Sequence, residues 1–177
     1  MAEIERTRVR EPERPNRNPY EIALQDDKAF AERQLLGRIV VKIDDCPQEL
    51  SRQGRLRFYL DPTIEGTPTS DWTVFTHEVR TVSGKHRHQG GLVIYVIEGK
   101  GYSVVDGERI DWEKGDLLLL PLRPNGVEHQ HFNAVPGSPA LWMAFTHQPM
   151  RRYLASEITQ TEISPEYRQQ QESGRGS

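Results

Sequence analysis

Residues 84–99 read GKHRHQGGLVIYVIEG, and residues 115–133 read GDLLLLPLRPNGVEHQHFN. Each stretch joins a His-x-His pair to a short run of aliphatic residues. Side chains two positions apart on a β-strand point to the same face of a sheet. Each pair therefore places two imidazoles on one wall of a β-structure. The pairs are His86 with His88, and His129 with His131.

Strand-like segments recur around these two stretches at intervals of roughly 8–12 residues. We expect strands at 38–43, 56–60, 72–79, 92–97, 102–105, 108–112, 117–120, 127–133 and 141–146. Asp106-Gly107 is a two-residue hairpin signal. No helical pattern long enough to connect parallel strands lies between these segments. The sequence therefore predicts an all-β sandwich or barrel.

Three parts are expected along the chain: an N-terminal arm and extension over 1–50, a β-barrel domain over 51–150, and a C-terminal tail over 151–177. Asp26-Asp27 and the following Gly37 predict a short helix over 27–36. The charged residues 1–19 predict a flexible arm. A second short helix is expected around 150–157, and the polar end at 169–177 is expected to be disordered.

Composition argues against several classes of function. The chain has 177 residues and a formal net charge of −3, which favours neither nucleic acid nor an anionic membrane surface as a partner. The single cysteine, Cys46, excludes an intrachain disulfide and fits a reducing compartment. The sequence shows neither a secretory signal pattern nor an apolar run of about 20 residues. We therefore expect a cytoplasmic protein.

Three imidazoles are the expected chemical centre. One His-x-His pair and a third histidine from a facing strand offer three nitrogens to one divalent metal, which leaves positions for water, substrate or dioxygen. Two such pairs about forty residues apart favour a metal site over isolated surface histidines. His77 and His147 stand alone and are interpreted as structural residues.

The two stretches resemble the two characteristic motifs of the cupin family. Residues 84–99 are similar to the first, and residues 124–133 meet the Pro-x-Gly-x-x-His-x-x-x-Asn spacing of the second in full. The resemblance covers about residues 55–147. It implies a cupin-type β-barrel or jelly roll with a partly helical N-terminal extension and a short C-terminal tail. It also implies three metal ligands: His86, His88 and His129.

The first motif departs from the cupin pattern at its glutamate ligand, where this chain has Leu92. Arg80 also replaces a leading glycine, and the second motif carries three extra residues between Pro121 and Gly126. Without the carboxylate, a bound divalent metal keeps its full double charge and one more open position. Both changes favour a bidentate anionic ligand, such as a phenolate with an adjacent carboxylate or carbonyl.

Among cupins, an all-histidine centre is similar to that of the gentisate and salicylate ring-cleaving dioxygenases. The resemblance implies a dioxygenase that uses Fe(II) and dioxygen to cleave a small hydroxylated aromatic or related substrate. Two alternatives stay open: a non-redox isomerase, lyase or decarboxylase using Mn, Ni or Zn, and a non-catalytic ligand-binding module. Imidazole alone does not choose among these metals.

Three further residues are catalytic candidates. We expect His131 to be a proton shuttle, an outer partner or a fourth ligand. Arg57 and Arg80 are candidate carboxylate clamps, because a guanidinium binds a carboxylate through two hydrogen bonds. The analogy with cupins also predicts a homodimer whose contact includes segments 72–79 and 38–43.

Overall fold

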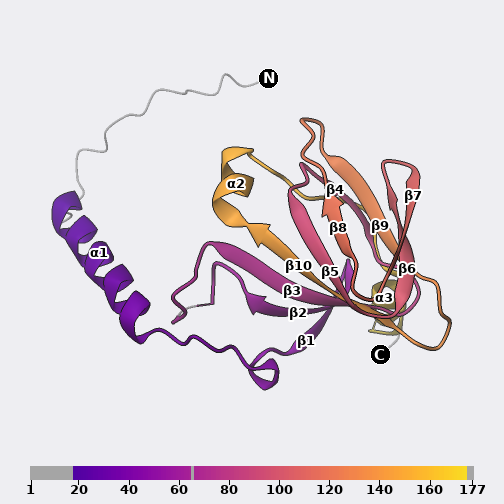
Figure 1. Ribbon diagram of the computed structural model, residues 1–177, viewed down its shortest axis with the longest axis horizontal. Helices are drawn as coiled ribbons and strands as arrows, with labels where there is room; N and C mark the ends of the chain where they lie inside the picture. Colours follow the sequence, from indigo (N-terminus) through magenta and orange to yellow (C-terminus); the bar gives the residue numbers. More distant parts are fainter. Residues whose placement is uncertain (1–17, 65, 175–177) are drawn as a thin grey trace.

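The computed structural model describes residues 18–64 and 66–174. Two antiparallel sheets face each other, and helix α1 stands away from them (Figure 1). The six-stranded sheet has the order β1-β2-β3-β10-β5-β8, and the five-stranded sheet has the order β11-β4-β9-β6-β7. This is the jelly-roll architecture of the cupin type that the sequence predicts. The expected arm at residues 1–19 lies outside the described residues, apart from its last two positions.

The strands have the following bounds: β1 Gln48–Ser51, β2 Gly54–Leu60, β3 Trp72–Val79, β4 Lys85–His88, β5 Leu92–Glu98, β6 Lys100–Val105, β7 Glu108–Glu113, β8 Leu117–Leu120, β9 Val127–Asn133, β10 Ala140–His147 and β11 Thr159–Glu162. The helices are α1 Pro19–Leu36, the 3₁₀ helix η1 Ile43–Asp45, α2 Gln148–Tyr153 and α3 Pro165–Gly174. None of these helices is both long enough and apolar enough to cross a membrane.

Alternating side chains build the core between the sheets. In β5, Leu92, Ile94 and Val96 are buried while Val93 and Tyr95 are exposed, which is the alternation of a strand with one face toward a core. The remaining core residues come from strands of both sheets and from their edges: Val79, Val105, Trp112, Leu118, Leu120, Val127, Ala140, Trp142 and Ala144. Trp142, with Ala140 and Ala144, is the part of β10 that points into this core.

The hairpin between β6 and β7 forms where Asp106-Gly107 predicts it. Asp106 has a φ of 48° and Gly107 a φ of 87°, so both residues adopt the left-handed conformation of a type I′ turn. This turn matches the right-handed twist of the two strands that it connects.

The N-terminal extension differs from its prediction in two ways. Helix α1 begins at Pro19 instead of near residue 27, because the Asn18 side chain accepts hydrogen bonds from the backbone N–H groups of Tyr20 and Glu21. The strand expected at 38–43 is wrong. This segment leads into η1 and pairs with no strand among the described residues.

The C-terminal segment belongs to the fold through residue 174, whereas its end at 169–177 was expected to be disordered. Strand β11 pairs with β4 and so completes the five-stranded sheet. Helix α3 then extends to Gly174, so the disorder expected from residue 169 is wrong for residues 169–174, and residues 175–177 lie outside the described part.

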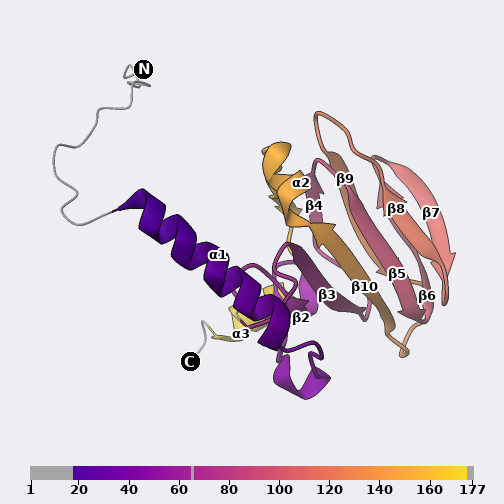
Figure 2. The same ribbon diagram turned by 60° about the vertical axis from the view of Figure 1, so that its left-hand side comes forward.

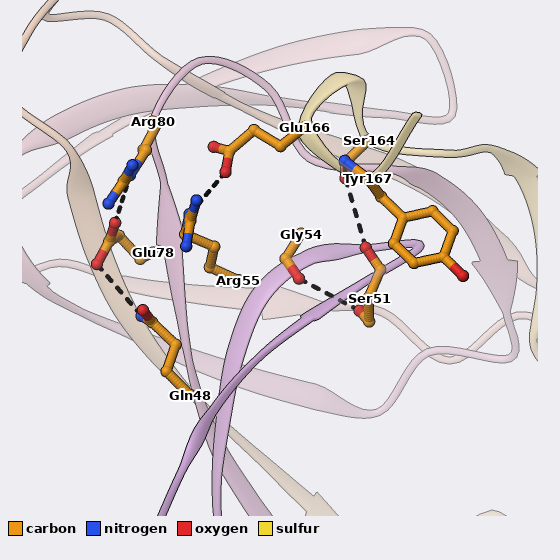
Figure 3. A network of polar contacts seen from close by, with 9 residues as sticks. All are labelled: Gln48, Ser51, Gly54, Arg55, Glu78, Arg80, Ser164, Glu166 and Tyr167. Atoms are coloured by element: carbon orange, nitrogen blue, oxygen red, sulfur yellow. Dashed lines mark hydrogen bonds and ion pairs between the residues drawn. The ribbon is translucent and has the colours of Figure 1, made fainter. Parts of the chain in front are cut away.

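Polar contacts fasten α3 to the first hairpin (Figure 3). The Arg55 guanidinium lies 2.6 Å from the Glu166 carboxylate, with both side chains partly buried. The backbone N–H of Ser164 donates to the carbonyl of Arg52 at 2.8 Å. The β1–β2 hairpin and the C-terminal segment are therefore held together.

Candidate metal centre

Strands β4 and β9 bring the two His-x-His pairs together. They are antiparallel neighbours in one sheet, and His86 lies directly opposite His129. His88 shares the face of His86 because it lies two residues further along β4. The third imidazole was expected from a facing strand, but it comes from the adjacent strand of the same sheet.

The three predicted ligands converge on one point. His86, His88 and His129 each offer a ring nitrogen, and these nitrogens all lie within 4.8 Å of one another. Two ligands bound to one ion at about 2.1 Å can be at most about 4.2 Å apart. Small rotations of the rings would therefore bring all three nitrogens within bonding distance of one ion.

Two of these rings hold buried nitrogens without hydrogen-bond partners among the described residues, namely His86 Nδ1 and His129 Nε2. His129 Nδ1 lies 3.3 Å from the Val127 carbonyl, which can only accept. This contact places the ring proton on Nδ1 and leaves the lone pair on the orphaned Nε2. A buried lone pair without a partner is costly, and a metal ion would satisfy it.

His88 is held differently. The backbone N–H of Gly90 donates to His88 Nδ1 at 3.0 Å, so this nitrogen acts as an acceptor. Gly90 has a φ of 89°. A Cβ at this position would also come within van der Waals overlap of the Pro121 carbonyl oxygen, so only glycine fits this turn. The turn after β4 thus fixes the His88 ring.

Burial keeps the three imidazoles neutral. Burial, with a smaller effect from the neighbouring histidines, lowers the pKa of His86 to about 3. Burial, together with the charge of Arg151, lowers the pKa of His88 to about 4. Burial also lowers the pKa of His129 well below 6.5. All three rings are therefore neutral near pH 7. His86 and His129 carry lone pairs without partners, whereas the His88 Nδ1 lone pair accepts from Gly90 and would have to leave that contact to bind a metal.

His131 lies on the same face of β9 but outside the convergent set. Its Nδ1 is 2.7 Å from the Ser103 hydroxyl, which in turn accepts a hydrogen bond from the Trp112 indole at 2.9 Å. Its ring packs against Trp142, with 4.9 Å between the ring centroids. His131 is fully buried, and its Nε2 has no described partner. This position favours the role of an outer partner over that of a fourth ligand.

A cavity of about 560 Å³ opens onto the histidines. His86 and His88 lie in its wall. Apolar side chains form much of the remaining lining: Leu56, Phe58, Phe75, Leu92 and Ile158. This volume falls within the range of small-ligand sites, and the apolar walls suit a flat ring.

Residues 73–146 match the family model of the cupin domain. This chain contains a cupin domain. The match includes all three convergent histidines and the strands that carry them. The cupin motifs predicted from the sequence are thereby confirmed, together with the fold class.

Several known dioxygenases are similar to this cupin. A gentisate 1,2-dioxygenase from Ralstonia sp is 35% identical over 51% of this chain and 24% of its own length. An acireductone dioxygenase from Phaeosphaeria nodorum is 27% identical over 64% of this chain and 65% of its own. The salicylate 1,2-dioxygenase of Pseudoaminobacter salicylatoxidans, solved with gentisate, has a TM-score of 0.51 at 20% identity, covering 78% of this chain and 36% of the other. This chain thus spans about a quarter of the gentisate enzyme.

Leu92, at the position of the usual cupin glutamate, lines the cavity beside His86 and His88. Among the described residues, the convergent ligand set contains histidines only, with no carboxylate. The centre thus has the all-nitrogen composition expected from the sequence.

The structure places neither predicted arginine clamp in this cupin's cavity. The Arg57 guanidinium donates to the backbone carbonyls of Ile43 and Cys46, on the outer side of β2. Arg80 is exposed and forms an ion pair with Glu78 at 2.6 Å (Figure 3). Both arginines therefore stabilise the surface of the protein, away from the described cavity lining.

Sequence reasoning missed the cavity residues that follow β10. Gln148 and Arg151 on α2, and Ser156, Ile158 and Gln160 around β11, all line the cavity. The local sequence was enough to predict a short helix near residue 150. The sequence gives no local sign that this helix and the following strand fold back over the histidines.

Proposed function

We propose that this cupin is a metal-dependent dioxygenase that acts on a small hydroxylated aromatic or related substrate. The observation that carries the proposal is the convergence of three neutral imidazoles, with no carboxylate among them, two of which line a largely apolar cavity. The similarity to gentisate, 5-aminosalicylate and acireductone dioxygenases supports the same class of reaction.

The residues present fit a divalent metal held by His86, His88 and His129. Orphaned lone pairs at His86 and His129 offer nitrogen ligands that suit iron as well as zinc, nickel or copper. We propose Fe(II); held by these three histidines, it would supply coordination positions for dioxygen and for the substrate.

The remaining cavity residues orient the substrate. Phe58, Phe75 and Leu92 form apolar walls against which an aromatic ring packs and which exclude water from the reacting atoms. His131 holds its place through Ser103 and supports the His129 side of the centre. Holding the substrate beside the ligands requires no titrating base from the protein, since a metal-bound hydroxyl loses its proton readily.

Oxygen uptake tests the proposal. Protein loaded with Fe(II) under anaerobic conditions should consume dioxygen when mixed with a hydroxylated aromatic acid or ketone from a broad panel. His129→Ala should abolish the uptake, whereas His147→Ala, in which a histidine paired with Asp71 is replaced, should retain it. Full iron occupancy without oxygen uptake, or turnover that persists with Zn(II) and without oxygen, would contradict a dioxygenase.

A further inference from the structure

Helix α2 places one arginine in the cavity and its neighbour outside it. Arg151 is half-buried and lines the cavity together with His86 and His88. Arg152, the next residue, is exposed and is absent from the described lining of this cavity. Successive residues of a helix point about 100° apart, so the same helix presents one cation to the ligand and the other to solvent.

The orientation of Arg151 is fixed by the first turn of α2. Gln148 is buried, its backbone N–H donates to the Asp71 carbonyl at 2.7 Å, and its side chain donates to the Thr73 hydroxyl at 2.6 Å. Residues three apart on a helix share a face. Because Gln148 faces the cavity, Arg151 faces it as well, and both line it.

The Arg151 guanidinium has no hydrogen bond or ion pair with any residue that the structure describes. It lies close enough to His88 to act on the charge of that ring. A divalent metal bound by neutral imidazoles would add two more positive charges nearby. Asp61 is the one acidic side chain in the described lining, and Arg52 adds a second cation, so the cavity has an excess of positive charge.

We propose that Arg151 is a specificity-determining residue that binds the carboxylate of a hydroxy-carboxylic acid substrate. The inference rests on the proposed function and deepens it by naming the substrate class. The guanidinium pairs with the carboxylate while the neighbouring hydroxyl faces the three histidines. Phe58 and Phe75 provide apolar walls for a ring between these two polar ends.

Binding to the Zn(II)-loaded protein tests this proposal without turnover. The probes are 2-hydroxybenzoate and its uncharged analogue 2-hydroxybenzamide, titrated by calorimetry into wild type, Arg151→Gln and the matched control Arg152→Gln. Wild type should prefer the acid. Arg151→Gln should weaken binding of the acid by about 10- to 100-fold, as expected for a lost charge-assisted contact, and change binding of the amide by less than about threefold. Arg152→Gln should leave both affinities unchanged.

The zinc content, measured first, distinguishes failure of the proposed metal centre from failure of the proposed role of Arg151. A wild-type protein that holds no zinc contradicts the metal centre and the inference with it. Full zinc occupancy without preference for the acid contradicts the role of Arg151 alone. Equal losses for acid and amide in Arg151→Gln would also overturn that role, because they would indicate damage to the cavity rather than loss of a carboxylate contact.

Discussion

Leu92 determines the charge of the centre at the scale of single residues. It lines the cavity beside His86 and His88, at the position where the cupin motif has a glutamate. A carboxylate there would approach the three nitrogens and cancel one positive charge of a bound metal. The leucine instead keeps the site cationic and therefore open to an anionic ligand.

Leu92→Glu should raise the affinity for Zn(II) and lower the affinity of the loaded protein for 2-hydroxybenzoate, each by about tenfold or more. The new carboxylate would bind the metal and repel the anion. Leu92→Gln is the matched control, since it has a similar shape but no charge. Metal and ligand titrations would count against this account of Leu92 if the two variants behaved alike.

His77 makes stability depend on pH. It is buried against Trp142, with 4.7 Å between ring centroids, and burial lowers its pKa from 6.5 to about 3. The unfolded chain therefore binds a proton between these pH values that the folded chain does not. Stability from the neutral ring is fully present above about pH 6.5 and is lost as pH falls toward 3.

We expect His77→Leu to reduce this loss by about 1.4 kcal/mol per pH unit between pH 6 and 4. Urea denaturation of the metal-free protein at several pH values measures the free energy of unfolding. A variant with the same pH slope as wild type would show that His77 is charged in the folded protein.

At the scale of elements, β11 supports the strand that carries two ligands. Gln160 lies opposite His86 in the ladder, and its amide donates to the carbonyls of Lys85 and Glu162 at 3.1 and 2.7 Å. Without β11, β4 would be an edge strand. The C-terminal segment, which lies beyond the matched cupin domain, thus braces the metal centre.

Gln160→Ala should lower the free energy of unfolding by about 1–2 kcal/mol and weaken Zn(II) binding, because one hydrogen bond from β11 to β4 and one within β11 are lost. Gln169→Ala, on the exposed face of α3, is the control and should change neither quantity. If Gln160→Ala lowers stability but leaves the affinity for Zn(II) unchanged, β11 does not support the metal site.

The local sequence pattern predicted most helices and strands, and tertiary contacts explain those that it missed or misplaced. The His-x-His spacing was enough to put His86 and His88 on one face, because that spacing is a property of any strand. Segment 38–43 has strand-forming residues, yet Ile39 is 86% exposed, and a strand forms only where a partner completes its ladder. The start of α1 was readable from Asn18-Pro19, a capping signal that the acidic pair further on obscured.

The candidate site was predictable only as far as its ligands. The three histidines are recognisable from their spacing within two motifs. The role of Arg151 depends on α2 and β4 lining the same cavity although they lie more than sixty positions apart in the sequence, and no local pattern encodes this. Arg57 and Arg80 were plausible by residue type alone, and their hydrogen bonds place them elsewhere.

At the scale of the whole molecule, α1 projects from the sheets (Figure 2). Within the described residues, this helix buries none of its side chains, and Leu35, Leu36, Ile39 and Val40 are exposed in succession around its end. A second apolar surface lies on the outer face of β5 and β8, where Tyr95 is exposed next to Leu117. An isolated helix of this length is marginal in water.

We propose that a second copy of the chain covers α1 and segment 38–43, the latter being part of the homodimer contact expected by analogy with cupins. Sedimentation velocity should give a mass near twice 20.4 kDa, about 41 kDa. Ile39→Asp, at a site that the folded monomer leaves open, should shift the protein toward the monomer. A wild-type protein that stays monomeric up to about 100 µM would contradict the dimer, since a stable dimer has a Kd well below this concentration.

X-ray absorption spectroscopy of the Zn(II)-loaded protein tests the metal centre most directly. We predict one zinc per chain, nitrogen ligands at about 2.0–2.1 Å, and multiple scattering from three imidazole rings. His129→Ala should reduce the imidazole count to two or abolish binding. Zinc that fails to bind stoichiometrically, or a spectrum with one imidazole or none, would contradict a three-histidine centre in this cupin.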